Sequence, residues 1–117
     1  MGADQVAEIA PFVREVFSGG ESLCATLELE GQPDVWVQVM IGTLNLAYPL
    51  QTEPSEHLAV VRELLPDARI ESWEPGTFLT ISFGPAQPLE IARAADRLLA
   101  RLFSLGDYSV NGSIEEM

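Results

Sequence analysis

The 117-residue chain contains no lysine, one cysteine and one histidine. A single cysteine excludes an intramolecular disulfide bond, which fits a protein of a reducing compartment. One cysteine and one histidine cannot supply the closed ligand set of a structural zinc site. The sequence also lacks a calcium-binding loop and the glycine spacing of a phosphate-binding motif. We therefore predict no metal and no cofactor.

Long apolar runs are missing too. No stretch approaches the roughly 18 consecutive apolar residues that suggest a membrane-spanning helix. The N-terminal sequence MGADQVAEIAPF has neither the basic region nor the apolar run of a signal peptide. A cytoplasmic location is therefore the expectation.

Basic residues are scarce: six arginines stand against 18 acidic residues, for a formal net charge of −12. A surface this negative repels nucleic-acid phosphate and anionic lipid, so we predict no nucleic-acid partner and no membrane partner. It attracts basic proteins, and it also keeps a chain soluble. The net charge alone does not separate these two roles.

Apolar residues make up 47% of the chain, which is enough for one hydrophobic core at this length. No repeat, low-complexity tract or long linker interrupts the sequence. We predict a single domain over residues 1–117.

Apolar spacing predicts a first helix that Asp4 caps and that ends at Gly19-Gly20. Pro11 removes one backbone donor and crowds the preceding turn. The helix is therefore expected either to kink at Pro11 or to begin near Ala10.

Two further helices are predicted later in the chain. The second begins around 52–54 and stops at Pro66, and the third begins at Pro88 with Gly106 as its C-terminal cap. The third is the clearest element, because its apolar residues form one continuous stripe.

Alternating apolar and polar residues predict strands over 22–30, 34–41, 43–50, 68–73 and 77–83, with a further extended segment over 107–114. Turns are expected at 31–33, at Gly42 and at 74–76. The order is α-β-β-β-α-β-β-α, with a sixth strand left open. It predicts an α+β fold: a two-layer sandwich whose antiparallel sheet of five or six strands has helices on one face.

Four large apolar residues are candidates for partner binding, because alternation places them on the sheet face opposite the core or at the end of a strand. Aromatic and methionine side chains on a polar sheet face are typical anchors for a protein partner. The alternatives are scattered exposure, or cover by the C-terminal segment through Tyr108 and Val110. The four candidates are Trp36, Met40, Trp73 and Phe78.

Half of the basic residues form one stripe, because Arg93, Arg97 and Arg101 follow each other at helical spacing. This stripe is a candidate contact for a second subunit or a partner. The alternative is a solvated helix face in which Glu90 and Asp96 neutralise part of the charge locally.

No catalytic residue is predicted. His57 would need a nucleophile and a carboxylate converging in space, and no local signature supports a pairing with Cys24. We expect His57 to lie on a helix surface and the chain not to be an enzyme. A pair of catalytic carboxylates hidden among the acidic residues is the weakest hypothesis that we keep.

The pattern over residues 4–105 resembles the class I type III secretion chaperones, and more broadly the Tir-chaperone-like superfamily with its stand-alone bacterial domains. The resemblance lies in the strands over 36–39 and 44–48, the proline-bounded second helix, and the helix end Phe103-Ser104-Leu105-Gly106. It implies an α/β sandwich that often dimerises and holds an extended client segment against apolar patches. The chain departs from the family in its short length and in the extended segment after the last helix, which puts the usual dimer in doubt.

These observations predict a non-enzymatic, chaperone-like protein-binding domain that holds a partner segment through apolar patches on an acidic surface. The partner is a protein, either a basic one or a second copy of the chain. The alternative is a small acidic inhibitor or immunity-type protein that blocks a basic partner through charge complementarity.

Overall fold

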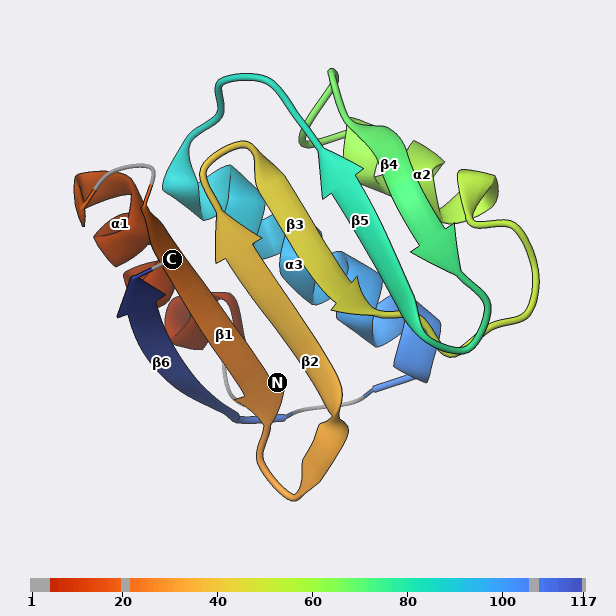
Figure 1. Cartoon of the computed structure of the whole chain (residues 1–117), viewed down its shortest axis with the longest axis horizontal. Helices are drawn as coiled ribbons and strands as arrows, with labels where there is room; N and C mark the ends of the chain where they lie inside the picture. Colours follow the sequence, from red (N-terminus) through yellow and green to blue (C-terminus); the bar gives the residue numbers. More distant parts are fainter. Residues whose placement is uncertain (1–4, 20–21, 106–107, 117) are drawn as a thin grey trace.

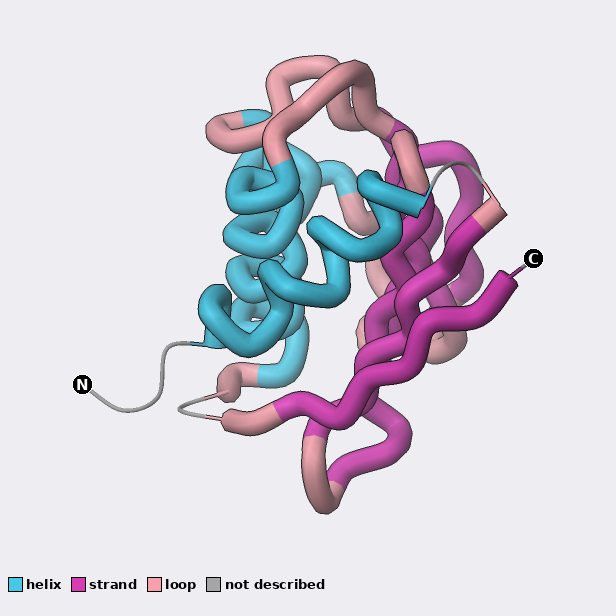
Figure 2. The backbone as a smooth tube through the Cα atoms, turned by 90° about the vertical axis from the view of Figure 1, so that its left-hand side faces the viewer, coloured by secondary structure: helices cyan, strands magenta, loops and turns pink. Residues whose placement is uncertain are grey.

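The computed structural model describes residues 5–19, 22–105 and 108–116 (Figure 1). Its elements follow the order α-β-β-β-α-β-β-α-β, and the helices pack on one face of the sheet (Figure 2). The predicted α+β class and the segregation of helices to one face are confirmed. The C-terminal segment forms the sixth strand.

The helices are α1 (Gln5–Gly19), α2 (Ser55–Arg62) and α3 (Pro88–Phe103). The strands are β1 (Leu23–Leu29), β2 (Gln32–Met40), β3 (Thr43–Ala47), β4 (Arg69–Glu74), β5 (Phe78–Ser82) and β6 (Val110–Glu116).

All strand pairs are antiparallel, and the sheet order is β4-β5-β3-β2-β1-β6. The predicted meander therefore forms the centre of the sheet. The C-terminal strand β6 pairs along the whole of β1 and becomes an edge. It extends the sheet sideways, so it does not cover the face opposite the helices.

Two glycines allow tight turns. Gly42 has a φ of 80° in the turn that pairs Met40 with Thr43, and Gly76 has a φ of 67° in the β4–β5 hairpin. Residues with a side chain rarely adopt such positive φ values, whereas glycine does so at little cost. The turn expected at 31–33 is shorter than predicted, because Gln32 already pairs with Leu29 next to an irregularity in register.

Helix α1 begins before Pro11 and continues past it, so the expected start near Ala10 is wrong. Pro11 is exposed, while Ile9, Ala10 and Val13 are buried against the core. Because tertiary packing fixes this apolar face, the loss of one helical hydrogen bond on the solvent side is tolerated. The expected cap Asp4 and the terminator Gly20 lie outside the described residues.

Helix α3 begins with a capping box, in which Gln87 and Glu90 satisfy each other's backbone N–H groups. It ends earlier than predicted, because Ser104 adopts the left-handed conformation (φ 53°) that closes the helix. The predicted cap, Gly106, lies outside the described residues. None of the helices in residues 5–19, 22–105 and 108–116 is long and apolar enough to cross a membrane.

The core lies between the sheet and the helices, and α3 supplies its largest helical share. The buried residues of α3 are Ile91, Ala92, Ala94, Ala95, Leu98, Leu99 and Leu102. The three buried alanines have small side chains, which allows neighbouring elements to approach the helix closely. The described helices therefore bury one face of the sheet and lie away from the other (Figure 2).

The segment that leads into β6 is tied to the helices by hydrogen bonds. The Tyr108 hydroxyl donates to Asp96 Oδ1 at 2.5 Å, and Gln5 Nε2 donates to the Tyr108 carbonyl oxygen at 3.2 Å. The Val110 N–H donates to Glu8 Oε1 at 3.2 Å. Burial, together with the Asp96 carboxylate, raises the pKa of Tyr108, so its phenol stays protonated and remains a donor.

We expect Tyr108→Phe to lower the free energy of unfolding by about 1 to 2 kcal/mol, because a hydrogen bond to a partly buried carboxylate is lost. Urea unfolding followed by circular dichroism measures the change. Ser109→Ala is the control, because Ser109 is the exposed neighbour of Tyr108. Equal stability of Tyr108→Phe and the wild type would show that this hydrogen bond does not hold the segment.

Candidate partner-binding surface

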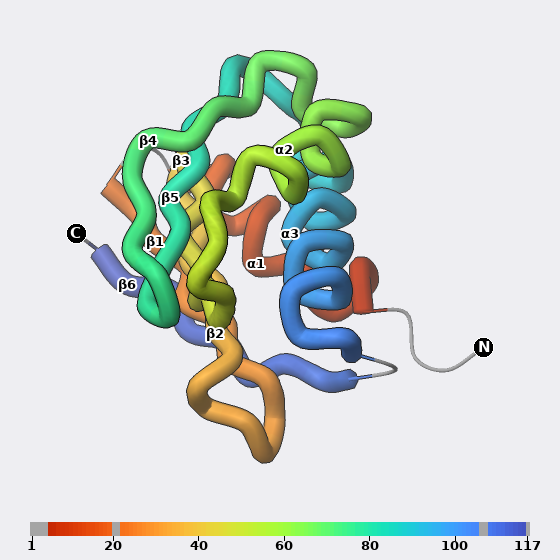
Figure 3. The backbone as a smooth tube through the Cα atoms, turned by 90° about the vertical axis from the view of Figure 1, so that its right-hand side faces the viewer, coloured from red at the N-terminus to blue at the C-terminus, as the bar shows by residue number. Residues whose placement is uncertain are grey.

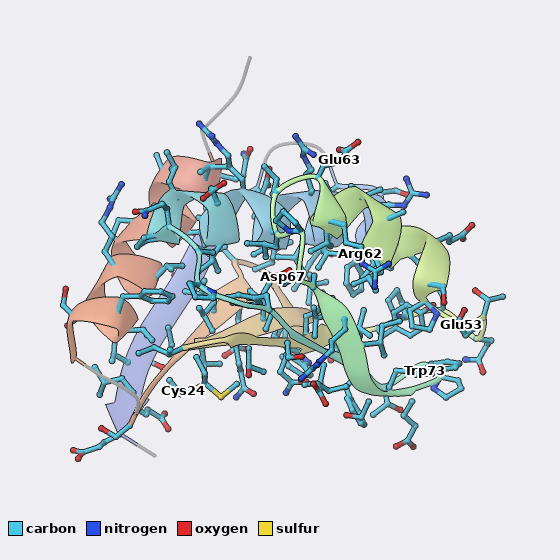
Figure 4. The ribbon with its side chains drawn as sticks, turned by 90° about the horizontal axis from the view of Figure 1, so that it is seen from above. Cys24, Glu53, Arg62, Glu63, Asp67 and Trp73 are labelled. Carbon is cyan, nitrogen blue, oxygen red and sulfur yellow. The ribbon has the colours of Figure 1, made fainter. Side chains whose placement is uncertain are left out.

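The sheet face opposite the helices, here called the outer face, receives three of the four predicted binding residues. Trp36, Met40 and Phe78 alternate with core residues along their strands, and each is half-buried. None of them belongs to the hydrophobic core. Cys24 points the same way, away from the helices (Figure 4). None of the helices that the structure describes covers this face (Figure 2).

One row of uncharged polar residues crosses the outer face over all six strands. Along it, Thr80 Oγ1 donates to Asn45 Oδ1 (2.9 Å), Asn45 Nδ2 to Gln38 Oε1 (3.0 Å) and Gln38 Nε2 to Thr26 Oγ1 (3.4 Å). These bonds satisfy the polar groups within the sheet. In spatial order from β6, the row is Ser113, Thr26, Gln38, Asn45, Thr80 and Ser72.

An apolar row lies next to the polar one. Ala47 on β3 pairs with Phe78 on β5, and Trp36 lies on β2, the strand on the other side of β3. The two ends of this row are acidic, because Glu28 pairs with Trp36 and Glu74 pairs with Phe78. Trp36, Ala47 and Phe78, here called the apolar row, are therefore flanked by a carboxylate on each side.

The four predicted residues do not form one patch. Met40 pairs with Thr43 on the far side of the polar row, four residues along β2 from Trp36. Trp73 lies on the core side, where it pairs with Leu79, and its ring meets that of Tyr48 edge to face at 5.9 Å between centroids. Only Trp36 and Phe78 share a row.

Charge is distributed unequally between the two layers. The three helices contain five carboxylates and five arginines, whereas the six strands contain six carboxylates and one arginine, Arg69. Arg69 is engaged locally, because its Nε lies 2.9 Å from Glu71 Oε1. A hydrogen bond from Ser82 and the nearby Arg69 lower the pKa of Glu71, which keeps that carboxyl ionised. The sheet is thus the acidic layer of the molecule.

His57 is buried, so the prediction of a surface histidine is wrong. Only 5% of the residue is exposed, and its ring meets the Tyr48 ring edge to face at 6.3 Å. Its Nδ1 accepts a hydrogen bond from Arg101 Nε at 2.9 Å, so the proton of the neutral imidazole lies on Nε2. Burial, reinforced by the Arg101 charge and opposed by Glu56, lowers the pKa of His57.

The arginine stripe on α3 is exposed, but two of its members have partners within the chain. Arg97 Nη1 lies 2.8 Å from Glu63 Oε2, and Arg101 donates to His57. The expected local partners are used elsewhere, since Glu90 caps α3 and Asp96 binds Tyr108. The side chain of Arg93 forms no ion pair with another described residue. A subunit contact through this stripe stays a prediction.

A groove of about 500 Å³ opens where the apolar row reaches the end of β3. The β1–β2 hairpin extends beyond this end of the sheet (Figures 1 and 3). Its β2 side lines the groove with Pro33, Asp34 and Trp36. We call this site the end groove; its lining residues are Pro33, Asp34, Trp36, Ala47, Tyr48, Pro49, Gly76, Thr77 and Phe103.

Sequence reasoning did not identify the end groove. One signal was available, because the two-residue turn Ile41-Gly42 pairs Met40 with Thr43 and thereby sets Trp36 beside Ala47. Phe103 could not be found in this way, because its position depends on how the end of α3 meets the sheet.

No group of three or more His, Cys, Asp or Glu side chains within the described part of the chain could hold a metal ion. Comparisons with family models, curated proteins and solved structures found no match to this chain. The resemblance to secretion chaperones therefore stays a prediction from the sequence pattern.

The buried His57 predicts a pH dependence of stability. Below the usual histidine pKa of about 6.5, His57 is protonated in the unfolded chain but stays neutral in the folded chain, because its pKa there is lowered. The free energy of unfolding therefore falls as the pH drops from 7.5 towards 5.5. Chemical unfolding at both pH values measures the fall. His57→Gln should reduce it, because His57 is the only histidine. An equal fall in both proteins would contradict a neutral, buried His57.

Proposed function

We propose that this chain is a non-enzymatic protein-binding domain that holds an extended, basic segment of a partner protein against the outer face. One observation supports this function above the others. The apolar row of Trp36, Ala47 and Phe78 lies between the carboxylates of Glu28 and Glu74, on a sheet face that α1, α2 and α3 leave uncovered. Such an arrangement offers apolar anchors at its centre and negative charge at its rim.

The charge distribution favours a basic partner over a second copy of the chain. Six carboxylates and one arginine in the strands would repel the same surface of another copy. A segment containing arginine or lysine is attracted to this surface and brings its charges close to Glu28 and Glu74. Because the helices contain equal numbers of carboxylates and arginines, attraction through the strands should orient the partner towards the sheet.

The dimensions of the apolar row suit an extended segment. Trp36 and Phe78 are separated by one intervening strand, so their backbones lie about 10 Å apart at the usual strand spacing. Three residues of an extended chain span a similar length. Side chains on one face of an extended chain are two or four residues apart, about 7 or 13 Å, and these spacings bracket the distance between the two strands. Two such apolar side chains can therefore contact both rings. This mode agrees with what the resemblance to secretion chaperones implies.

A displayed library of random 12-residue peptides tests the proposal, with the purified chain as bait. We expect enriched peptides to combine arginine or lysine with aliphatic or aromatic residues two to four positions away. Trp36→Ala with Phe78→Ala should weaken the best synthetic peptide by roughly tenfold or more, because truncation of anchor residues typically costs more than 1 kcal/mol. Fluorescence anisotropy of the labelled peptide measures the affinity.

Leu89→Ala is the matched control, because Leu89 is also a large apolar residue but lies on α3 with 38% exposure. Circular dichroism must show that all variants remain folded. Peptide binding that survives the double substitution would overturn the proposal. So would exclusive binding to folded basic proteins, the result expected of an inhibitor or immunity-type protein.

A further inference from the structure

We infer that the end groove is a receptor site for a single arginine side chain of the bound partner. This inference rests on the proposed function, because the groove continues directly from the apolar row. Trp36 and Ala47 belong to both. A segment held across Trp36 and Phe78 therefore has this groove beside it and can place one side chain inside.

The groove is built from fixed segments. The Tyr48 N–H donates to the Thr77 carbonyl oxygen at 3.4 Å, and the Gly76 N–H donates to the Leu50 carbonyl oxygen at 2.9 Å. These bonds join the chain that leaves β3 to the β4–β5 hairpin. The Tyr48 hydroxyl also binds the Thr52 carbonyl oxygen, which holds the same loop from its other side. These hydrogen bonds hold the walls of the groove in position.

The lining favours a flat cation. Trp36 and Phe103 provide half-buried aromatic rings, and Pro33 and Pro49 add apolar surface. A guanidinium group stacks on aromatic faces, and its aliphatic stem packs on apolar surface. The volume of about 500 Å³ lies in the usual range for sites that bind small ligands.

Asp34 gives the groove its selectivity. It is the only charged residue of the lining, it is exposed, and no other described residue hydrogen-bonds or ion-pairs with its side chain. A carboxylate accepts two parallel hydrogen bonds from a guanidinium group, a geometry that an ammonium group cannot reproduce. Glu28, which pairs with Trp36, adds negative charge nearby. An apolar or anionic side chain would leave Asp34 without a partner.

N-acetyl-L-arginine amide and its neutral analogue N-acetyl-L-citrulline amide test the inference. Titration against ¹⁵N-labelled protein, followed at the Trp36 indole N–H, gives the affinity of each probe. We expect the arginine probe to bind roughly fivefold tighter, the sum of a cation–π contact and an exposed ion pair. Asp34→Asn should reduce this preference to about twofold, because only the stacking contact remains.

Glu30→Gln is the control, because Glu30 is an exposed carboxylate of the same hairpin that does not line the groove. Equal affinity for the two probes, or a preference that survives Asp34→Asn, would overturn the arginine site. If peptides still required Trp36 and Phe78 in that case, the proposed function would stand without it. If the probes bound as expected while peptides ignored Phe78, the arginine site would stand and the extended docking mode would fail.

Discussion

The one-sided burial of the sheet determines the rest of this structure. Helix α3 packs a continuous apolar stripe into the core, and α1 lies beside it, so aliphatic residues of the central strands are enclosed on one face only. Antiparallel sheets tolerate this arrangement, because successive side chains point to opposite faces. Side chains on the outer face are therefore not packed against the described helices.

The outer face combines a polar row with an apolar row. Hydrogen bonds between side chains link Thr26, Gln38, Asn45 and Thr80 across four strands, which gives the sheet centre a satisfied polar surface. The adjacent apolar row keeps two aromatic rings half-buried between carboxylates. A surface of this kind stays hydrated and acidic in the free protein and still offers apolar anchors to a partner.

A second set of contacts stabilises the end of the molecule where the groove opens. The Tyr48 ring meets Trp73 and His57 edge to face, and His57 accepts a hydrogen bond from Arg101 on α3. Four elements distant in sequence are joined there: the chain after β3, α2, the end of β4, and α3. Trp73 contributes to this support from the core side and not to the outer face. Aromatic contacts of this geometry add to stability beyond their buried area.

The sequence by itself determined the class of the fold, since periods of two and of 3.6 residues mark the strands and helices and require one shared core. It also placed Trp36, Met40 and Phe78 on the outer face, because alternation along a strand is a local property. Burial of His57 and the position of Trp73 on the core side were decided only by the tertiary structure. Each depends on contacts between residues far apart in the chain: Arg101 with His57, and Tyr48 with Trp73, which follows a register shift in the pairing of β4 with β5. Local sequence patterns do not show which distant residues come into contact. Only the folded chain therefore brings Phe103 together with Asp34 and Trp36 in one groove.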